Sequence, residues 1–230
     1  MRARAALSAL FAWAIAQGLT EANPVVGTSQ PAALRPRERV LSDAELIEVW
    51  KACGGEDDCE RIIRLLVLTA CRRAEVGGMR WSELDSERGT WTIPGERTKN
   101  GRTHTLPLPP MAWEIIEAVP HRAGIDCYSV EEVAADHVRT SAAVSAAGPA
   151  AACPCRSRTA ATRLGDLGTP PHVIEAVLNH ASGFRAGVAG TYNRALYQNE
   201  MRAALAMWAD HIRSLVEGGE RKIVQLPARA

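Results

Sequence analysis

The chain has 230 residues, 47% of them apolar, and a formal net charge of +1. A chain of this length can bury a sufficient core for one full domain plus a small extra piece, so it does not require a disulfide or metal staple. No apolar run is long enough to cross a membrane, and the net charge gives no global sign of a nucleic-acid partner. Residues 61–110 nevertheless carry nine basic and five acidic side chains, which permits a local basic surface.

The six cysteines indicate neither a disulfide framework nor a metal site. Cys71 lies inside an apolar run, and at this chain length reduced intracellular thiols are favoured over disulfides. Cys153 and Cys155 lack a second pair or a nearby histidine at zinc-finger spacing, so we expect no metal there.

The first 18 residues, "MRARAALSALFAWAIAQG", place basic residues before an apolar stretch, as a secretory signal peptide does. The apolar residues, however, have the three-and-four spacing of a helix with one apolar face: Leu7, Leu10, Phe11 and Ile15. Gly18 suits the end of such a helix, and we expect the helix to pack against something. The Pro-rich stretch over residues 25–40 predicts a linker.

The main part of the chain begins with helices. Ser42 and Glu45 in "SDAE" form a capping box, in which each side chain accepts a hydrogen bond from a free backbone N–H of the other residue. This motif predicts a helix from Ser42 to about Ala52. The run "RIIRLLVLTACRRAEV" predicts a strongly apolar helix that is buried on one face and ends near two arginines.

A small antiparallel sheet is predicted next. Short β-type runs occur at Trp91–Ile93 and Thr103–Leu108, and Asn100-Gly101 lies before the second run. Asn-Gly is typical of a type I′ hairpin turn, because both central residues of that turn need positive φ. The stretch "PMAWEIIEAV" then returns to a helical pattern.

The pattern fades between about residues 124 and 157, where nine of the 19 residues over 134–152 are alanine. It resumes with "TAATRLGDLG", a helix with a glycine stop, and with "TPPHVIEAVLNH", a helix with proline in its first turn. A long helix from Asn199 to about Leu215 precedes a polar tail. We therefore predict a mainly α fold with a small antiparallel β-sheet (α+β).

Four segments together resemble the tyrosine recombinases, or phage integrases. "LTACRRAEVGGMRW" resembles their first arginine box, and "TKNGRTHTLPL" resembles their β-hairpin with a lysine before the turn. "VIEAVLNH" resembles their late helix that ends in histidine, and "VAGTYNRALY" resembles the segment with the nucleophilic tyrosine. The resemblance implies the family's catalytic-domain fold over residues 41–217, followed by a tail over 218–230. It also implies that residues 1–24 are the last helix of a core-binding domain, of which the remainder and any N-terminal arm are lacking.

The resemblance implies a chemistry in which a tyrosine attacks a DNA phosphate and forms a 3′-phosphotyrosine, with no metal and no cofactor. Guanidinium groups suit the charge that develops on the phosphate, because they are permanently charged and bidentate. The matching residues are Arg72 as phosphate clamp, Glu75 as its orienter, Lys99 as general acid, His180 as phosphate ligand or proton carrier, and Tyr192 as nucleophile. Arg73 and Arg102 are expected to contact DNA, and Tyr197 is a rival for the role of nucleophile.

One expected motif is replaced. The family's second arginine box, His-x-x-Arg, belongs at the start of the helix that contains Thr159. Aligning on Thr159 puts Pro154 at the histidine and Ser157 at the arginine, within "CPCRSR". Arg156 and Arg158 flank the position, but adjacent helical residues point about 100° apart, so neither replaces it by default. A short frame slip in the gene would account for the abrupt edges of residues 124–157.

The resemblance therefore implies a site-specific recombinase or integrase domain of a mobile element, impaired in cleavage. It implies double-stranded DNA as partner, self-association into a tetramer on DNA, no membrane, and a cytoplasmic, nucleoid-associated location. A non-catalytic DNA-binding or interaction remnant with the same fold is the alternative, and an unrelated helical regulator is a third interpretation. The third would place the matched residues far apart, whereas the first requires one concave basic surface lined by Arg72, Lys99, His180 and Tyr192.

Overall fold

The computed structural model describes residues 2–29, 39–55, 57–120, 126, 156–180 and 197–218. The chain divides into two compact units, Met1–Glu38 and Arg39–Ala230. The helices of these ranges are α1 (Arg2–Ala16), α2 (Asp43–Ala52), α3 (Asp58–Thr69), α4 (Arg73–Gly77), α5 (Pro110–Glu117), α9 (Arg156–Asp166), α10 (Pro171–Val177) and α12 (Gln198–Glu217). The strands are β1 (Leu84–Asp85), β2 (Thr90–Ile93) and β3 (His104–Pro107). Two short 3₁₀ helices are η1 (Trp81–Glu83) and η2 (Gly95–Arg97).

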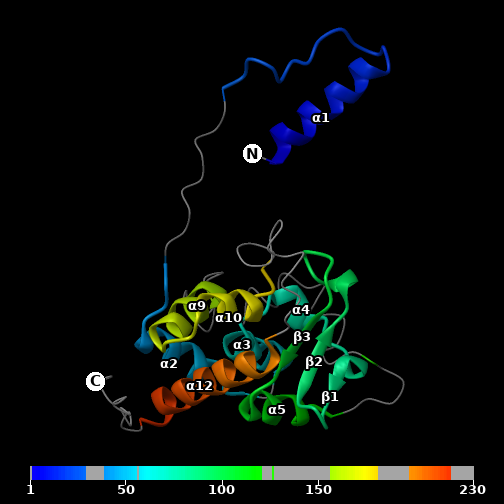
Figure 1. Ribbon diagram of the computed structural model, residues 1–230. Coiled ribbons are helices and arrows are strands. Elements are labelled where there is room, and N and C mark those ends of the chain that lie inside the picture. Colours follow the sequence, from blue (N-terminus) through cyan, green and yellow to red (C-terminus); the bar gives the residue numbers. More distant parts are fainter. Residues whose placement is uncertain are drawn as a thin grey trace, which may run out of the picture. The chain divides into compact units, whose positions relative to one another are not determined.

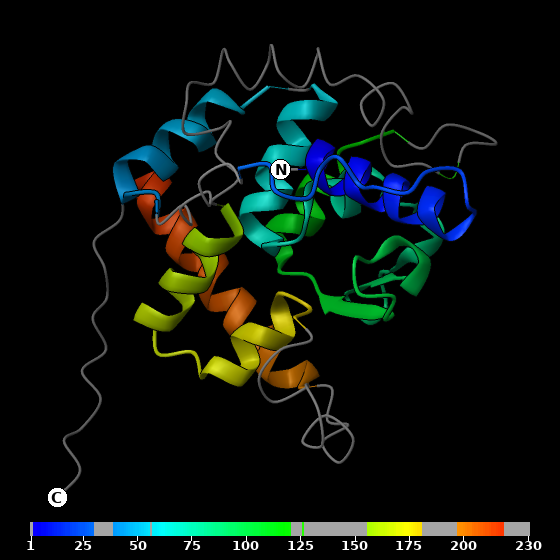
Figure 2. The same cartoon turned by 90° about the horizontal axis from the view of Figure 1, so that it is seen from above.

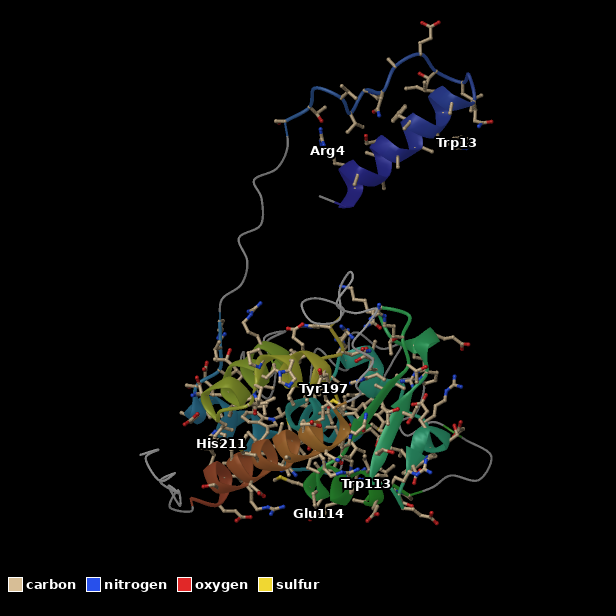
Figure 3. The ribbon with its side chains drawn as sticks, viewed as in Figure 1. Arg4, Trp13, Trp113, Glu114, Tyr197 and His211 are labelled. Atoms are coloured by element: carbon tan, nitrogen blue, oxygen red, sulfur yellow. The ribbon has the colours of Figure 1, made fainter. Side chains whose placement is uncertain are left out.

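The first unit contains α1 and a segment that folds back along it. The Arg4 guanidinium donates to the carbonyls of Val25 and Thr28, both at 3.2 Å, and its position on α1 is seen in Figure 3. The predicted helix is present, and Gly18 follows it with φ 70°. The side chains of the expected apolar face are largely exposed, Leu10 by 54%, so the packing of this face stays a prediction. The boundary between a helical remnant and a linker also stays a prediction.

Helix α3 lies in the middle of the second unit, surrounded by α4, α5, α9 and α12 (Figures 1 and 2). The prediction that this helix is buried on one face is wrong, because the consecutive residues from Leu65 to Thr69 are all buried by the elements that surround the helix. The indole N–H of Trp208 in α12 donates to the carbonyl of Val67 in α3 at 2.8 Å. The core is therefore built between early and late parts of the chain.

The α3 helix ends earlier than its sequence indicates. It stops at Thr69, Ala70 adopts the left-handed conformation with φ 56°, and a new short helix, α4, starts at Arg73. The Thr69 hydroxyl donates to the carbonyl of Leu65 at 2.7 Å and accepts from the Cys71 N–H at 3.3 Å. The prediction of a helix continuing to the two arginines is therefore wrong by three residues, because side chains at the break satisfy the freed backbone groups.

The sheet is three-stranded and antiparallel, in the order β1-β2-β3. Trp91 of β2 pairs with Leu106 of β3, and both are fully buried. The two predicted β runs are confirmed, but the predicted type I′ turn is wrong. Gly101 has φ 70°, whereas Asn100 does not have positive φ, and the connection between β2 and β3 extends over residues 94–103.

The remaining helices agree with their sequence signals. The Ser42–Glu45 capping box opens α2, Pro171 lies at the start of α10, and Gly168 follows α9 with φ 87°. In Figure 1, α9 and α10 lie on one side of α12, and α10 contacts α12 directly. The predicted fold class, mainly α with one small antiparallel sheet, is confirmed. Within the described ranges, no helix has the length and apolarity that a membrane span requires.

Candidate active site

Arg72 is held in place by Glu75. Its guanidinium donates from Nη1 to Glu75 Oε1 at 2.7 Å, and its backbone N–H donates to Glu75 Oε2 at 2.9 Å. The Glu75 side chain is 4% exposed, whereas that of Arg72 is 33% exposed. One carboxylate therefore fixes both the backbone and the cation at the start of α4, and the guanidinium keeps a solvent-facing edge for an anion.

Arg97 joins the Arg72 segment to the connection between β2 and β3. Arg97 in η2 donates from Nη2 to the backbone carbonyl of Glu75 at 2.6 Å, and from Nη1 to both carboxylate oxygens of Glu83. The Glu83 carboxylate also accepts from the indole N–H of Trp91 at 3.0 Å. The side chains of this ion pair are mostly buried. The base of the connection is therefore anchored to α4.

The connection that carries Lys99 is compact. The Thr98 hydroxyl donates to the carbonyl of Arg102 at 2.8 Å, and the Asn100 side-chain oxygen accepts from the Arg102 N–H at 3.1 Å. A Cβ on Gly95 would come within 2.6 Å of the carbonyl oxygen of Gly101, so the two backbones approach as closely as glycine allows. Lys99 is exposed between these bonded neighbours.

The same connection contacts the end of α10. Asn100 Nδ2 donates to the Asn179 carbonyl at 2.8 Å and to Asn179 Oδ1 at 3.1 Å. The next residue, His180, is 44% exposed, and its Nδ1 lies 3.4 Å from Glu175 Oε1. A further contact joins β3 to α10, because the His104 ring Nε2 lies 3.2 Å from the Val177 carbonyl oxygen. The segments of Lys99 and His180 therefore meet through hydrogen bonds.

Ser157, at the position matched to the second arginine, lies beside the Arg72 segment. Its hydroxyl donates to the carbonyl of Ala70 at 3.0 Å, two residues before Arg72. The neighbouring Arg158 points elsewhere, because its Nη1 lies 3.4 Å from the carbonyl of Arg39. Position 157 thus faces the first arginine segment, and Arg158 does not occupy that place.

The expected nucleophile Tyr192 lies outside the described part of the chain, as do Pro154, at the position matched to the box histidine, and the two cysteines that flank it, Cys153 and Cys155. The side chain of Arg156 is likewise not described. Arg73 and Arg102 are exposed. Tyr197 precedes α12 and is half-buried, with its ring centroid 4.9 Å from that of His172 (Figure 3).

The described contacts bring three of the matched segments together. Arg72 is bonded to Glu75, Glu75 to Arg97 of the connection, and the connection to the residue before His180. In Figure 1, α4, α10 and the upper ends of β2 and β3 lie along one side of the second unit, and Figure 2 looks down on that side. The single concave surface that includes Tyr192 stays a prediction. In the described ranges, no three or more His, Cys, Asp or Glu side chains gather as metal ligands.

Cys71 is the buried neighbour of this arginine. Burial and, to a lesser degree, the nearby Glu75 carboxylate raise the pKa of its thiol from 9.0 to about 12. A hydrogen bond from Thr69 and the charge of Arg72 act in the opposite direction. The thiol is therefore neutral at physiological pH and does not compete for the Arg72 guanidinium.

A model of the family described as "Phage integrase family" matches residues 44–198. The chain belongs to the phage integrase family. It is 30% identical over 227 residues to prophage integrase IntZ of Escherichia coli (strain K12), covering 94% of this chain and 56% of IntZ. It is 33% identical over 160 residues to prophage integrase IntA of the same strain, covering 66% of this chain and 38% of IntA. The chain thus spans about half, or less, of the length of these relatives.

Solved integrase structures share the fold. An integrase from mycobacterium phage Brujita superimposes with a TM-score of 0.56 at 20% identity, covering 93% of this chain and 75% of that one. A lambda integrase dimer bound to a COC′ core site gives a TM-score of 0.55 at 20% identity, covering 82% and 57%. The resemblance drawn from the four sequence segments is confirmed at the level of family and fold.

Sequence reasoning missed the residues that join these integrase segments. In the sequence, Asn100 indicates only a turn and Asn179 only the end of a helix. The partners Arg97 and Glu83 carry no sequence signal, because their pairing depends on the fold. Asn179 could have been noticed, since asparagine directly after a helix is typical of a left-handed capping residue.

Proposed function

We propose that this chain is the catalytic domain of a site-specific DNA recombinase that is impaired in strand cleavage. Family membership supports the reaction class, and the bond between Arg72 and the buried Glu75 is the observation that carries it. A preformed, partly exposed guanidinium on a fixed carboxylate is suited to a phosphate that gains charge in the transition state. Residues 41–217 would form this domain, 1–24 a helix of the preceding domain, 25–40 a linker and 218–230 a tail.

In this proposal the Tyr192 phenol oxygen forms a bond to phosphorus while the bond from phosphorus to the 5′-oxygen breaks. The leaving 5′-oxygen takes a proton from the Lys99 ammonium, and the products are a 3′-phosphotyrosine and a free 5′-hydroxyl. Arg72 binds the non-bridging oxygens. His180 accepts the phenol proton, or it donates to a non-bridging oxygen and the phenol proton passes to water. Because a phosphate ester bond is retained, rejoining needs no external energy source.

The substrate would be double-stranded DNA, with Arg73 and Arg102 contacting the phosphates. We also propose self-association on DNA, a role in a mobile element and a cytoplasmic, nucleoid-associated location. Since phosphate contacts dominate such binding, duplex affinity should fall steeply between about 50 and 200 mM salt. An affinity that ignores salt would contradict the DNA-binding part of the proposal.

Ser157 supports the qualification that cleavage is impaired. A serine hydroxyl bonded to the Ala70 carbonyl offers no cation to the phosphate. Loss of one charge-stabilising donor typically costs on the order of 10²–10³ in rate. The same observation favours the second candidate, a DNA-binding or interaction remnant that has kept the fold and lost the reaction.

The test is covalent trapping on DNA. The full chain is incubated with a pool of nicked duplexes of randomised sequence, because the nick lets a short fragment diffuse away and prevents rejoining. We expect a low yield of denaturation-resistant protein–DNA adduct that disappears in Tyr192→Phe while duplex binding is unchanged. Tyr197→Phe is the matched control and should keep the adduct.

An adduct that persists in Tyr192→Phe but not in Tyr197→Phe would make Tyr197 the nucleophile. If no adduct forms in the parent chain or in Ser157→Arg, the chain is the non-catalytic remnant.

A further inference from the structure

Lys99 and His180 belong to segments that meet through the amide side chains of Asn100 and Asn179, which are 79 residues apart in sequence. We propose that this amide pair is a positioning device that fixes the Lys99 segment on the His180 end of α10. Resting on the proposed function, the pair would place the general acid relative to the phosphate that it serves. Neither asparagine would touch the DNA.

Asn179 fixes its side of the contact through the backbone. It has φ 49°, a left-handed conformation that asparagine tolerates better than most residues, and it is 4% exposed. Its N–H donates to the Ala176 carbonyl at 3.2 Å, and the His180 N–H donates to the Glu175 carbonyl at 3.0 Å. This paired arrangement is a Schellman motif, so the residue that reaches the connection also defines where His180 leaves the helix.

Asn100 fixes the other side through both ends of its amide. Its oxygen accepts from the Thr98 hydroxyl at 3.2 Å and from the Arg102 N–H at 3.1 Å, within the connection. Its NH₂ group donates across to Asn179. An aspartate at this position could still accept the two internal bonds and the bond from Asn179 Nδ2, which lies 3.4 Å from Asn100 Oδ1, but it would have no proton for the Asn179 carbonyl. Asn100→Asp therefore removes the two bonds that Asn100 donates to Asn179 and keeps the bonds within the connection, whereas Asn179→Gly removes the Asn179 side-chain amide without adding a charge.

Such a device matters because a lysine is a difficult acid to place. Its stem is flexible, and proton transfer requires the donor within about 2.6–3.2 Å of the leaving oxygen. A displacement of about 1 Å can cost on the order of 10²-fold in rate. The Arg97 anchor holds the base of the connection to α4, and the amide pair holds its tip to α10, so the backbone of Lys99 is restrained from both ends.

The first test measures the contact without catalysis, by amide hydrogen exchange on the full chain. Asn179→Gly keeps the left-handed backbone and removes only the side-chain amide. We expect exchange over residues 98–103 to rise about tenfold, although the substitution is remote in sequence. Asn100→Asp should reciprocally raise exchange of the His180 amide. The control Asn199→Asp makes the same chemical change on an exposed residue of α12 and should change neither segment; unchanged exchange in Asn179→Gly overturns the proposal.

The second test asks whether the contact acts through Lys99. Cleavage is compared for an ordinary phosphodiester and for one with sulfur in place of the bridging 5′-oxygen, since a thiolate leaves without a proton. Asn179→Gly, which adds no charge beside Lys99, should slow the ordinary substrate about tenfold to a hundredfold and the sulfur substrate less than about threefold. Lys99→Ala should show the same pattern, whereas equal slowing of both substrates would mean that the pair has only a structural role.

Where the parent chain is too slow, the comparison is made in Ser157→Arg. If neither cleaves either substrate, the proposed function fails, and the role of the pair in cleavage fails with it. Hydrogen exchange then still decides whether the pair joins the two segments, so the two failures are distinguishable.

Discussion

The starts of α4 and α9 meet at Ala70, yet they differ in what they offer to an anion. At α4, Arg72 is bonded to the buried carboxylate of Glu75, and the backbone carbonyl of Glu75 accepts a hydrogen bond from Arg97. At α9, Ser157 makes one hydrogen bond to the Ala70 carbonyl, although the helix is otherwise well anchored: the Thr159 hydroxyl accepts from the Leu41 N–H at 3.0 Å, and Leu164 is fully buried. A helix can thus be held in place through one face while position 157, on the face toward Ala70, carries no charged side chain.

The largest expected effect is on the rate of cleavage, and it comes from placing an arginine at the start of α9 as well as at the start of α4. Ser157→Arg should raise the rate of covalent adduct formation on the nicked duplex pool by about 10²–10³-fold, because it adds a guanidinium beside the Arg72 segment. The initial rate of adduct formation is measured by denaturing electrophoresis of samples taken during the reaction.

Arg158→Ala provides the control, since the Arg158 guanidinium lies at the Arg39 carbonyl. We expect its adduct rate to stay within about twofold of the parent. A large loss in this variant would mean that Arg158 already serves the second position and that the contrast between the two helices is false.

Glu75→Gln weakens the contact that holds Arg72 at the start of α4. Glutamine has one acceptor oxygen for the two donors of Arg72, so a buried charge-assisted bond is lost. Because the Arg72 side chain is one third exposed, we expect a moderate decrease of about 1–2 kcal/mol in the free energy of unfolding, measured by urea denaturation. Glu114→Gln changes an exposed glutamate of α5 (Figure 3) and should stay within about 0.5 kcal/mol.

Burial of Cys71, next to α4, should make the free energy of unfolding depend on pH in the alkaline range. Its pKa is about 12 in the native state, against 9.0 for an ordinary thiol, so between these values the unfolded chain has lost a proton that the native chain retains. The free energy of unfolding should then fall by about 1.4 kcal/mol per pH unit above pH 9. Urea denaturation at pH 8, 9 and 10 should show this slope reduced by that amount in Cys71→Ala, and identical slopes would contradict the burial argument.

The smallest expected effect on stability comes from Ser157, at the start of α9. Ser157→Ala removes only the bond to the Ala70 carbonyl and should cost about 0.5–1.5 kcal/mol in the free energy of unfolding. A cost above that of Glu75→Gln would reverse the comparison, because Ser157 would then be the stronger anchor.

Local signals account for what the sequence could predict. The capping box at Ser42 depends on residues three apart, and the glycine after α9 on one backbone angle, so both could be identified without a fold. The break at Ala70 could not, because no glycine or proline marks it and its stability comes from Thr69 and Glu75. The conformation of Asn100 depends on Asn179, which is distant in sequence.

The same division applies to the site. The contact between Arg72 and Glu75 spans three residues and was anticipated through the resemblance. The ion pair of Arg97 with Glu83 and the direction of Arg158 depend on packing, and no spacing in the sequence encodes them. Tyr192 lies outside the described residues, so its role stays a prediction.

Helix α12 packs against α2, α3, β3, α9 and α10, and Trp208 bonds to a carbonyl 141 residues earlier. During translation, α3 is made long before α12, one of the helices that cover it, so the nascent chain carries an incompletely covered apolar helix until residues 198–217 leave the ribosome. Interruption within residues 124–157 would release a polypeptide in which α4 and α5 are present but α9 and α12 are missing, so that part of α3 stays exposed to chaperones and proteases. Continued reading through the alanine-rich stretch is therefore a condition for a folded product, whatever that stretch itself contributes.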